Sequence, residues 1–217
     1  MKHRTQRVMK CTLCEDRKAR RFCPGVRQDI CAPCCGQERE QTILCPFDCE
    51  FLHEARRHER LPANDPKTAP SPDVRVTEAF LDEHEALIFS LGAAILESFY
   101  QVNGAVDSDV AEALDALVRT HRTLDTGLYY ETRPDNPIAR ALQGRIEERL
   151  KAHEQARREQ QATSYREAEL VGALVFFQRT LWHAANGRRK GRAFLDYLRQ
   201  NFEALRPAEQ NPIIVAP

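Results

Sequence analysis

Eight cysteines lie between residues 11 and 49 of this 217-residue chain, and the rest of the sequence contains none. Two pairs, Cys11/Cys14 and Cys31/Cys34, have the two-residue spacing that lets both thiolates of a turn face one ion. Together they supply the four ligands of a tetrahedral zinc site. Because the segment offers few large apolar side chains, we expect each structural zinc to contribute on the order of 10 kcal/mol of folding free energy.

Disulfide bonds are the alternative use of eight cysteines, and they require an oxidising compartment. The basic first ten residues are followed by a charged stretch, without the apolar run of an export signal. The C-x2-C-x2-C run that is typical of four-iron clusters is also absent. We therefore expect zinc as the cofactor, a cytoplasmic protein and no membrane association.

The N-terminal segment resembles a known zinc module. The residues that carry the resemblance are Cys11-Thr-Leu-Cys14, Arg21-Phe-Cys-Pro24 and Asp29-Ile-Cys-Ala-Pro-Cys34. They are similar to the first part of a B-box zinc finger, as found in tripartite-motif proteins. The resemblance implies a cross-brace with two zinc ions, in which ligand pairs one and three share one ion and pairs two and four share the other. The chain departs from the family at Val26, where a ligand is usual, and it lacks the closing histidine pair.

The second zinc site is assigned from the remaining cysteines. Adjacent cysteines point in different directions, so Cys34 and Cys35 are suited to different ions. His53 is the alternative ligand if Cys35 faces away. The expected second set is Cys23, Cys35, Cys45 and Cys49. Eight cysteines for two ions indicate closed structural sites without an open position for water, so we expect no enzymatic activity.

Four regions follow from the composition along the chain. Residues 1–60 form the zinc finger, and 61–73 form a linker with four prolines. Residues 74–206 are expected to form an all-helical bundle of about five helices, and 207–217 form a tail. Helix start and stop signals place these helices from Thr77 to Asn103-Gly104, from Asp107 or Ser108, from Asn136-Pro137, from a Ser164/Glu167 capping box to Asn186-Gly187, and from Phe194 to Pro207.

The charge balance bears on nucleic-acid binding. Residues 1–60 hold 13 basic and 9 acidic residues, and eight thiolates with two zinc ions cancel that excess. A near-neutral module is unusual for a nucleic-acid binder. A local basic face remains in the loop that contains Arg17, Lys18, Arg20 and Arg21. The expected role of that loop is to balance thiolate charge, with nucleic acid as the alternative partner.

Two further loops stand out in the helical region. Residues 127–134 contain Tyr129 and Tyr130, which either form a contact surface or cover the open end of the bundle; we expect burial, because large rings are usually buried. Residues 187–192 are strongly basic and are expected to form a solvated turn between helices.

Three functions are compatible with these features. The first is a non-catalytic adaptor or regulator that binds an unknown protein partner through the finger and the bundle. The second is a nucleic-acid-binding zinc finger, and the third is a thiol redox or zinc-release sensor that uses Cys34 and Cys35. Wide apolar stripes on the helices leave room for a homodimer.

Overall fold

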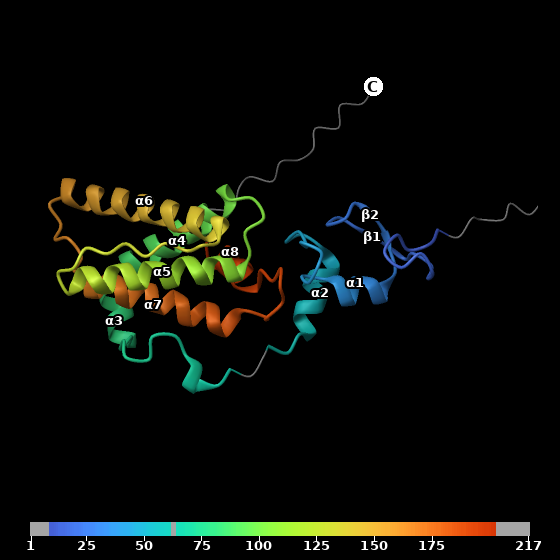
Figure 1. The fold of residues 1–217 in the computed structure, drawn as a ribbon, viewed down its shortest axis with the longest axis horizontal. Coiled ribbons are helices and arrows are strands. Elements are labelled where there is room, and N and C mark those ends of the chain that lie inside the picture. The colour runs from blue at the N-terminus through green and yellow to red at the C-terminus, as the bar shows by residue number, and fades with distance from the viewer. Residues whose placement is uncertain (1–8, 62–63, 203–217) are drawn as a thin grey trace, which may run out of the picture. The chain divides into compact units, whose positions relative to one another are not determined.

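The computed structural model describes residues 9–61 and 64–202, and the chain forms two compact units. Unit 1 contains the N-terminal region to residue 63 together with residues 185–192, and unit 2 contains residues 64–184 and the chain from 193 onward. Figure 1 shows the elements in chain order, with the cysteine-rich region in blue. The chain is mostly helical, as expected, with one small sheet in the N-terminal region.

Unit 1 is built around its cysteines. Strand β1 (Arg21–Cys23) pairs antiparallel with β2 (Gln28–Ile30), and two short helices follow, α1 (Ala32–Glu38) and α2 (Glu50–His58). The buried core of this unit contains six cysteines and only three large aliphatic residues, Ile30, Ile43 and Leu52. So small an apolar core is insufficient alone, which is the condition under which metal ligation contributes to folding.

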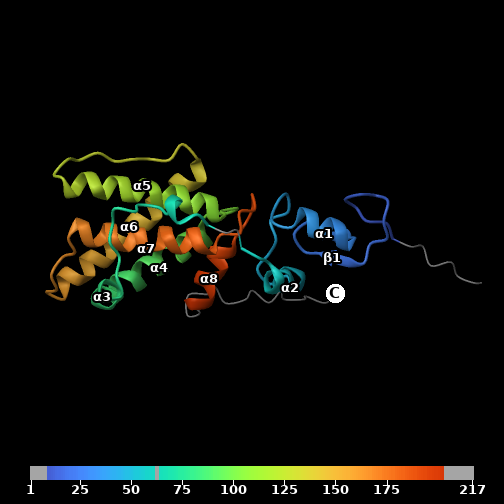
Figure 2. The same cartoon turned by 90° about the horizontal axis from the view of Figure 1, so that it is seen from below.

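Unit 2 is a bundle in which four long helices lie side by side, as Figures 1 and 2 both show. Its described elements are the short 3-10 helix η1 (Pro66–Thr68) and the helices α3 (Glu78–Glu83), α4 (Glu85–Gln101), α5 (Asp107–Asp125), α6 (Pro137–Glu159), α7 (Glu167–Ala184) and α8 (Ala193–Asn201). Helix α5 packs against both α6 and α7, and α4 packs against the same two helices. The buried core consists mainly of leucine, isoleucine, valine and alanine from these helices.

Local capping signals place two helix starts correctly. The Thr77 hydroxyl accepts a hydrogen bond from the backbone N–H of Phe80, 3.2 Å away. The Asn136 side chain accepts from the backbone N–H of Ile138 at 3.0 Å, with Pro137 in the first turn. Both caps satisfy N–H groups that have no partner within their own helix.

The first predicted helix is divided in two. Helix α3 ends at Glu83 and α4 begins at Glu85, with His84 at φ −112° and ψ 26° between them. The Phe80 ring packs against the His84 ring at a tilt of 56°, with 4.5 Å between the centroids. It also lies over Gly172 of α7, where a Cβ atom would approach the ring to 2.5 Å. The sequence pattern cannot reveal this break, because the apolar spacing continues through it.

The predicted Ser164/Glu167 capping box is wrong. Helix α7 begins at Glu167 itself, and the carboxylate of Glu169 accepts a hydrogen bond from the backbone N–H of Arg166 at 3.1 Å. The cap therefore lies two residues further along the chain. Tyr165 lies outside the helix, with its ring stacked on the ring of His153. The Arg157 guanidinium covers the Tyr165 ring, 3.9 Å from its centroid.

The described part of the proline-rich region, residues 64–73, belongs to unit 2. The Arg179 guanidinium donates to the carbonyls of Pro70 and Ser71, and Asn64 donates to the carbonyl of Trp182 at 2.6 Å. These contacts attach the segment to α7, so it is not a free spacer. The predicted tail 207–217, and the predicted end of the fifth helix at Pro207, lie outside the described residues.

Candidate metal centre

The first cysteine pair lies in a tight turn near the start of unit 1. The backbone N–H of Cys11 donates to the carbonyl of Arg17, and that of Glu15 donates back to the carbonyl of Cys11 at 2.7 Å. Glu15 has a positive φ of 53°, which reverses the chain immediately after Cys14. This turn brings the side chains of Cys11 and Cys14 to the same side.

The second pair lies at the start of α1. Cys31 is the N-cap residue, and its sulfur accepts a hydrogen bond from the backbone N–H of Cys34 at 3.5 Å. Pro33 favours the first turn, because its fixed φ suits a helix start and its missing N–H is not needed there. Helix initiation thus places Cys31 and Cys34 one turn apart on the same face.

The four sulfurs of Cys11, Cys14, Cys31 and Cys34 form one cluster. All lie within 4.8 Å of one another, and the Cys14 and Cys31 sulfurs are 4.0 Å apart. A zinc ion with Zn–S bonds of about 2.3 Å requires sulfurs separated by about 3.8 Å in a tetrahedron. The cluster therefore fits a zinc ion, and the first predicted set is brought together.

The cysteines of this cluster differ in their pKa values. Burial acts to raise the pKa of Cys11, but hydrogen bonds from the backbone of Cys31, Cys14 and Leu13 outweigh it and lower the pKa to about 6. Hydrogen bonding to Cys31, together with burial, raises the pKa of Cys34 to about 12. Four thiolates this close repel one another, and a divalent cation is the group that relieves the repulsion.

The remaining four cysteines line a common cavity of about 10 Å³. Among the described residues, the first set is the one whose sulfurs gather around a single point, and a second such cluster is not shown. The cavity of the remaining four is close to the size of one water-sized sphere. These cysteines are Cys23 at the end of β1, Cys35 in α1, Cys45 in the following loop and Cys49 before α2. All eight cysteines of the chain are described, and each is free of disulfide bonding.

Cys35 and His53 differ in their surroundings. Cys35 is adjacent to Cys34 yet lines the cavity, so the two neighbours face different groups of cysteines. The Nε2 atom of His53 lies at the backbone carbonyl of Phe47, and His53 is not among the described residues that line the cavity. Cys35 as the eighth ligand, with His53 as the alternative, stays a prediction.

Two of the four predicted basic residues contact cysteine sulfur. The Arg17 guanidinium lies 3.9 Å from the Cys31 sulfur, and the Arg21 guanidinium lies 3.6 Å from the Cys35 sulfur. Arg21 also covers the Phe51 ring at 4.1 Å from its centroid. These two guanidinium groups are placed to offset thiolate charge, although Arg17 is an exposed residue, as are Lys18 and Arg20.

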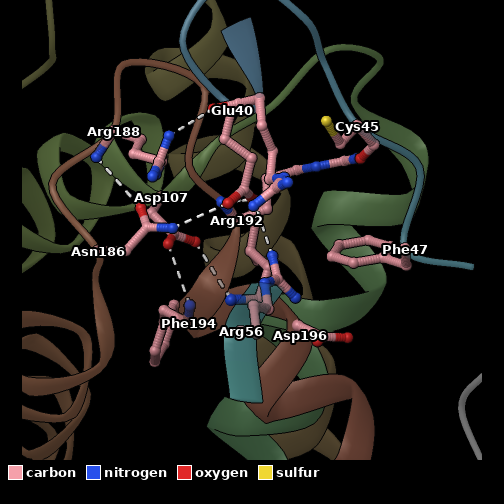
Figure 3. A network of polar contacts seen from close by, with 12 residues as sticks. Glu40, Cys45, Phe47, Arg56, Asp107, Asn186, Arg188, Arg192, Phe194 and Asp196 are labelled. Carbon is pink, nitrogen blue, oxygen red and sulfur yellow. Dashed lines mark hydrogen bonds and ion pairs between the residues drawn. The ribbon is translucent and has the colours of Figure 1, made fainter. Parts of the chain in front are cut away.

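A buried carboxylate in unit 1 was not anticipated from the sequence. Glu40 is 1% exposed, and its oxygens accept from Arg56 at 2.8 Å, from the Asn186 amide at 2.8 Å and from the backbone N–H of Arg192 at 3.2 Å. Figure 3 shows Glu40 with these three partners. The basic loop expected to be a solvated turn is therefore part of unit 1 and neutralises this carboxylate. The only sequence signal was the unusual density of arginine between two glycines.

The two tyrosines of the α5–α6 loop are not buried. Tyr129 is 83% exposed, Tyr130 is 67% exposed, and the preceding Leu128 is 66% exposed. The expectation that these rings cover the end of the bundle is therefore wrong, and the alternative of a contact surface stays open. Burial fails because the loop is attached by its backbone instead of by its side chains.

Comparison with known proteins gives no match, whether to a family model, to a curated protein or to a solved structure. The B-box resemblance accordingly rests on the cysteine pattern and on the cluster of Cys11, Cys14, Cys31 and Cys34. Within the described residues, no helix combines the length and the apolar character needed to cross a membrane.

Proposed function

We propose that this protein is a zinc-stabilised, non-catalytic adaptor that binds a protein partner. The observation that carries the proposal is the run of three large exposed side chains at Leu128, Tyr129 and Tyr130. Tyrosine is enriched at protein interfaces, because its ring supplies a large apolar area while its hydroxyl remains hydrated. Such a run is uncommon on a surface that binds nothing.

The tyrosine loop is held in place by backbone hydrogen bonds. The Thr123 hydroxyl donates to the carbonyl of Tyr130 at 3.0 Å, and the backbone N–H of Leu128 donates to the carbonyl of Thr123 at 2.9 Å. Further along, the backbone N–H of Thr132 donates to the Thr120 hydroxyl at 2.9 Å. A loop whose backbone is attached in this way has less backbone entropy to lose on binding, which favours affinity.

Unit 1 contributes the metal-dependent part of the proposal. Cys11, Cys14, Cys31 and Cys34 would hold one zinc ion, and Cys23, Cys35, Cys45 and Cys49 would hold a second in a B-box-like cross-brace. The second site is supported by the single small cavity that all four cysteines of the second set line. When bound, zinc supplies folding free energy and a rigid surface. A cytoplasmic location belongs to the same proposal, because a reducing compartment keeps cysteines available as metal ligands.

The contacts of the basic residues favour a protein partner over nucleic acid. Two of the four basic residues, Arg17 and Arg21, direct guanidinium groups to sulfur, which reduces the charge that the loop offers to phosphate. Few phosphate contacts give weak binding, because phosphate neutralisation supplies most of the non-specific affinity for nucleic acid.

A capture experiment with the purified full-length chain tests the proposal. We expect a protein retained by the wild type to be lost from a Tyr129→Ser/Tyr130→Ser double variant and retained by Tyr197→Ser. Tyr197 is the matched control, a 46% exposed tyrosine in α8. Replacing Cys11 and Cys14 by serine reports whether unit 1 also takes part. Equal retention by the double variant and the wild type contradicts the role of the tyrosine loop.

A further inference from the structure

The segment between α7 and α8, residues 185–192, contacts the part of unit 1 that carries the second cysteine set. Its polar contacts begin at Glu40, whose backbone carbonyl accepts from the N–H of Lys190 at 2.7 Å. Asn186 and Arg192 contact the carboxylate of the same residue. Glu40 therefore binds this segment through both its main chain and its side chain. A carboxylate that is 1% exposed needs such partners, because an unpaired buried charge is strongly destabilising.

Arg192 connects this segment to the backbone of Cys45. It is 9% exposed, its guanidinium donates to the backbone carbonyl of Cys45, and it covers the Phe47 ring at 4.3 Å from the centroid. Figure 3 shows Arg192 beside Cys45 and Phe47. The loop after Cys45 continues to Cys49, whose N–H donates to the carbonyl of Pro46. One arginine from a distant segment therefore holds the backbone that positions two cysteines of the set.

A second arginine acts near Cys35. The Arg188 guanidinium donates to the backbone carbonyl of Arg39 at 2.9 Å and to the Glu59 carboxylate at 2.9 Å. The Arg39 guanidinium lies 3.9 Å from the Cys35 sulfur. The partners named here for the segment's polar contacts lie between residues 39 and 59, whereas the first zinc set is formed by cysteines at 11–34. The two sets therefore differ in their dependence on this segment.

We propose that Arg192, in the part of unit 1 formed by residues 185–192, is a positioning residue which determines how tightly the second cysteine set holds zinc. This inference rests on the second zinc of the proposed function. The physical basis is that groups supporting metal ligands from outside the coordination sphere hold them in the ligating geometry. Loss of such groups typically weakens metal binding by about 10-fold to 100-fold. The coupling is reciprocal: zinc in the second set stabilises the segment, and the segment stabilises the zinc.

Zinc release from the full-length protein into a chromogenic chelator tests the proposal. The test variant is Arg192→Gln and the control is Arg189→Gln. The control removes the same charge from an exposed side chain that lies three residues earlier in the chain. We expect the wild type and R189Q each to release two zinc ions, and the release rates of R189Q to equal those of the wild type. R192Q is expected to release one of the two at least about 10-fold faster, with the other unchanged. Circular dichroism of each variant establishes that unit 2 remains helical.

Three results would overturn the proposal, and they are distinguishable. If R192Q retains both ions with wild-type kinetics, the arginine does not support the site. If both ions leave faster, the effect is general loss of folding and not support of the second set. If the wild type holds only one ion, the second site of the proposed function itself fails.

Amide hydrogen exchange of the wild-type protein provides a readout that needs no variant. Removal of the zinc held by the second cysteine set should increase exchange at Lys190 and Arg192, whose N–H groups donate to Glu40. Unchanged exchange at these two amides would contradict the reciprocal coupling.

Discussion

Replacing Asp107 should destabilise unit 2 more than any ordinary helix-start substitution. Asp107 is the first residue of α5, yet its carboxylate accepts hydrogen bonds from the backbone N–H groups of Phe194 at 3.0 Å and Leu195 at 3.2 Å, at the start of α8. Figure 3 shows this contact. Asp107 is 5% exposed, and Phe194 and Leu195 are fully buried. The two N–H groups would therefore have no access to water if the carboxylate were removed.

The magnitude follows from the cap and from its burial. Loss of a capping side chain costs about 1 kcal/mol, and an unsatisfied buried N–H costs about 1–3 kcal/mol. We expect Asp107→Ala to lower the free energy of unfolding by about 3 kcal/mol, equivalent to a Tm lower by about 10 °C for a unit of this size. Asp107→Asn keeps an acceptor oxygen and should lose about 1 kcal/mol.

Urea unfolding followed by far-ultraviolet circular dichroism measures this effect. Asp125→Ala is the matched control, because Asp125 is exposed at the other end of the same helix. Its effect should lie within about 0.5 kcal/mol of zero. If D107A and D125A have equal stability, the cap of α8 by α5 does not contribute and the reasoning is refuted.

Two other substitutions test unit 2. Burial, aided by the nearby Arg157, lowers the pKa of His153, so the fold favours neutral histidine and unfolding takes up a proton as the pH falls. Wild-type stability should therefore decrease between about pH 7 and pH 5, and His153→Gln should decrease less; parallel pH profiles in urea unfolding would contradict this. Asn136→Ala removes the cap of α6 and a 2.7 Å hydrogen bond to Asp109, and should lower the free energy of unfolding by about 1 kcal/mol in the same assay. A variant as stable as the wild type would show that the cap is dispensable.

Local sequence signals predicted the helical content and the first metal cluster well. Thr77 and Asn136 act within three residues of their own positions, and the Cys11/Cys14 spacing acts within one turn. Interactions of this range are encoded in the local sequence and can be predicted from it. The capping box at Ser164 failed because Glu169 offered a competing cap two residues later.

Long-range polar contacts could not be predicted. Glu40 and Arg192 are separated by 152 residues, and Asp107 and Phe194 by 87, so no local pattern relates them. In sequence, Asp107 resembles an ordinary helix-start residue and Arg192 an ordinary surface cation. Their burial and their partners arise only from the tertiary fold. For the same reason, the composition of the basic loop suggested a solvated turn although it forms part of unit 1.

Native mass spectrometry of the full-length chain, compared with its mass after denaturation, tests the central claim most directly by counting bound zinc. We expect two zinc ions in the wild type and one in a Cys11→Ser/Cys14→Ser variant. A wild type with one ion would contradict the second site, and a wild type with no zinc and oxidised cysteines would contradict the metal-stabilised finger altogether.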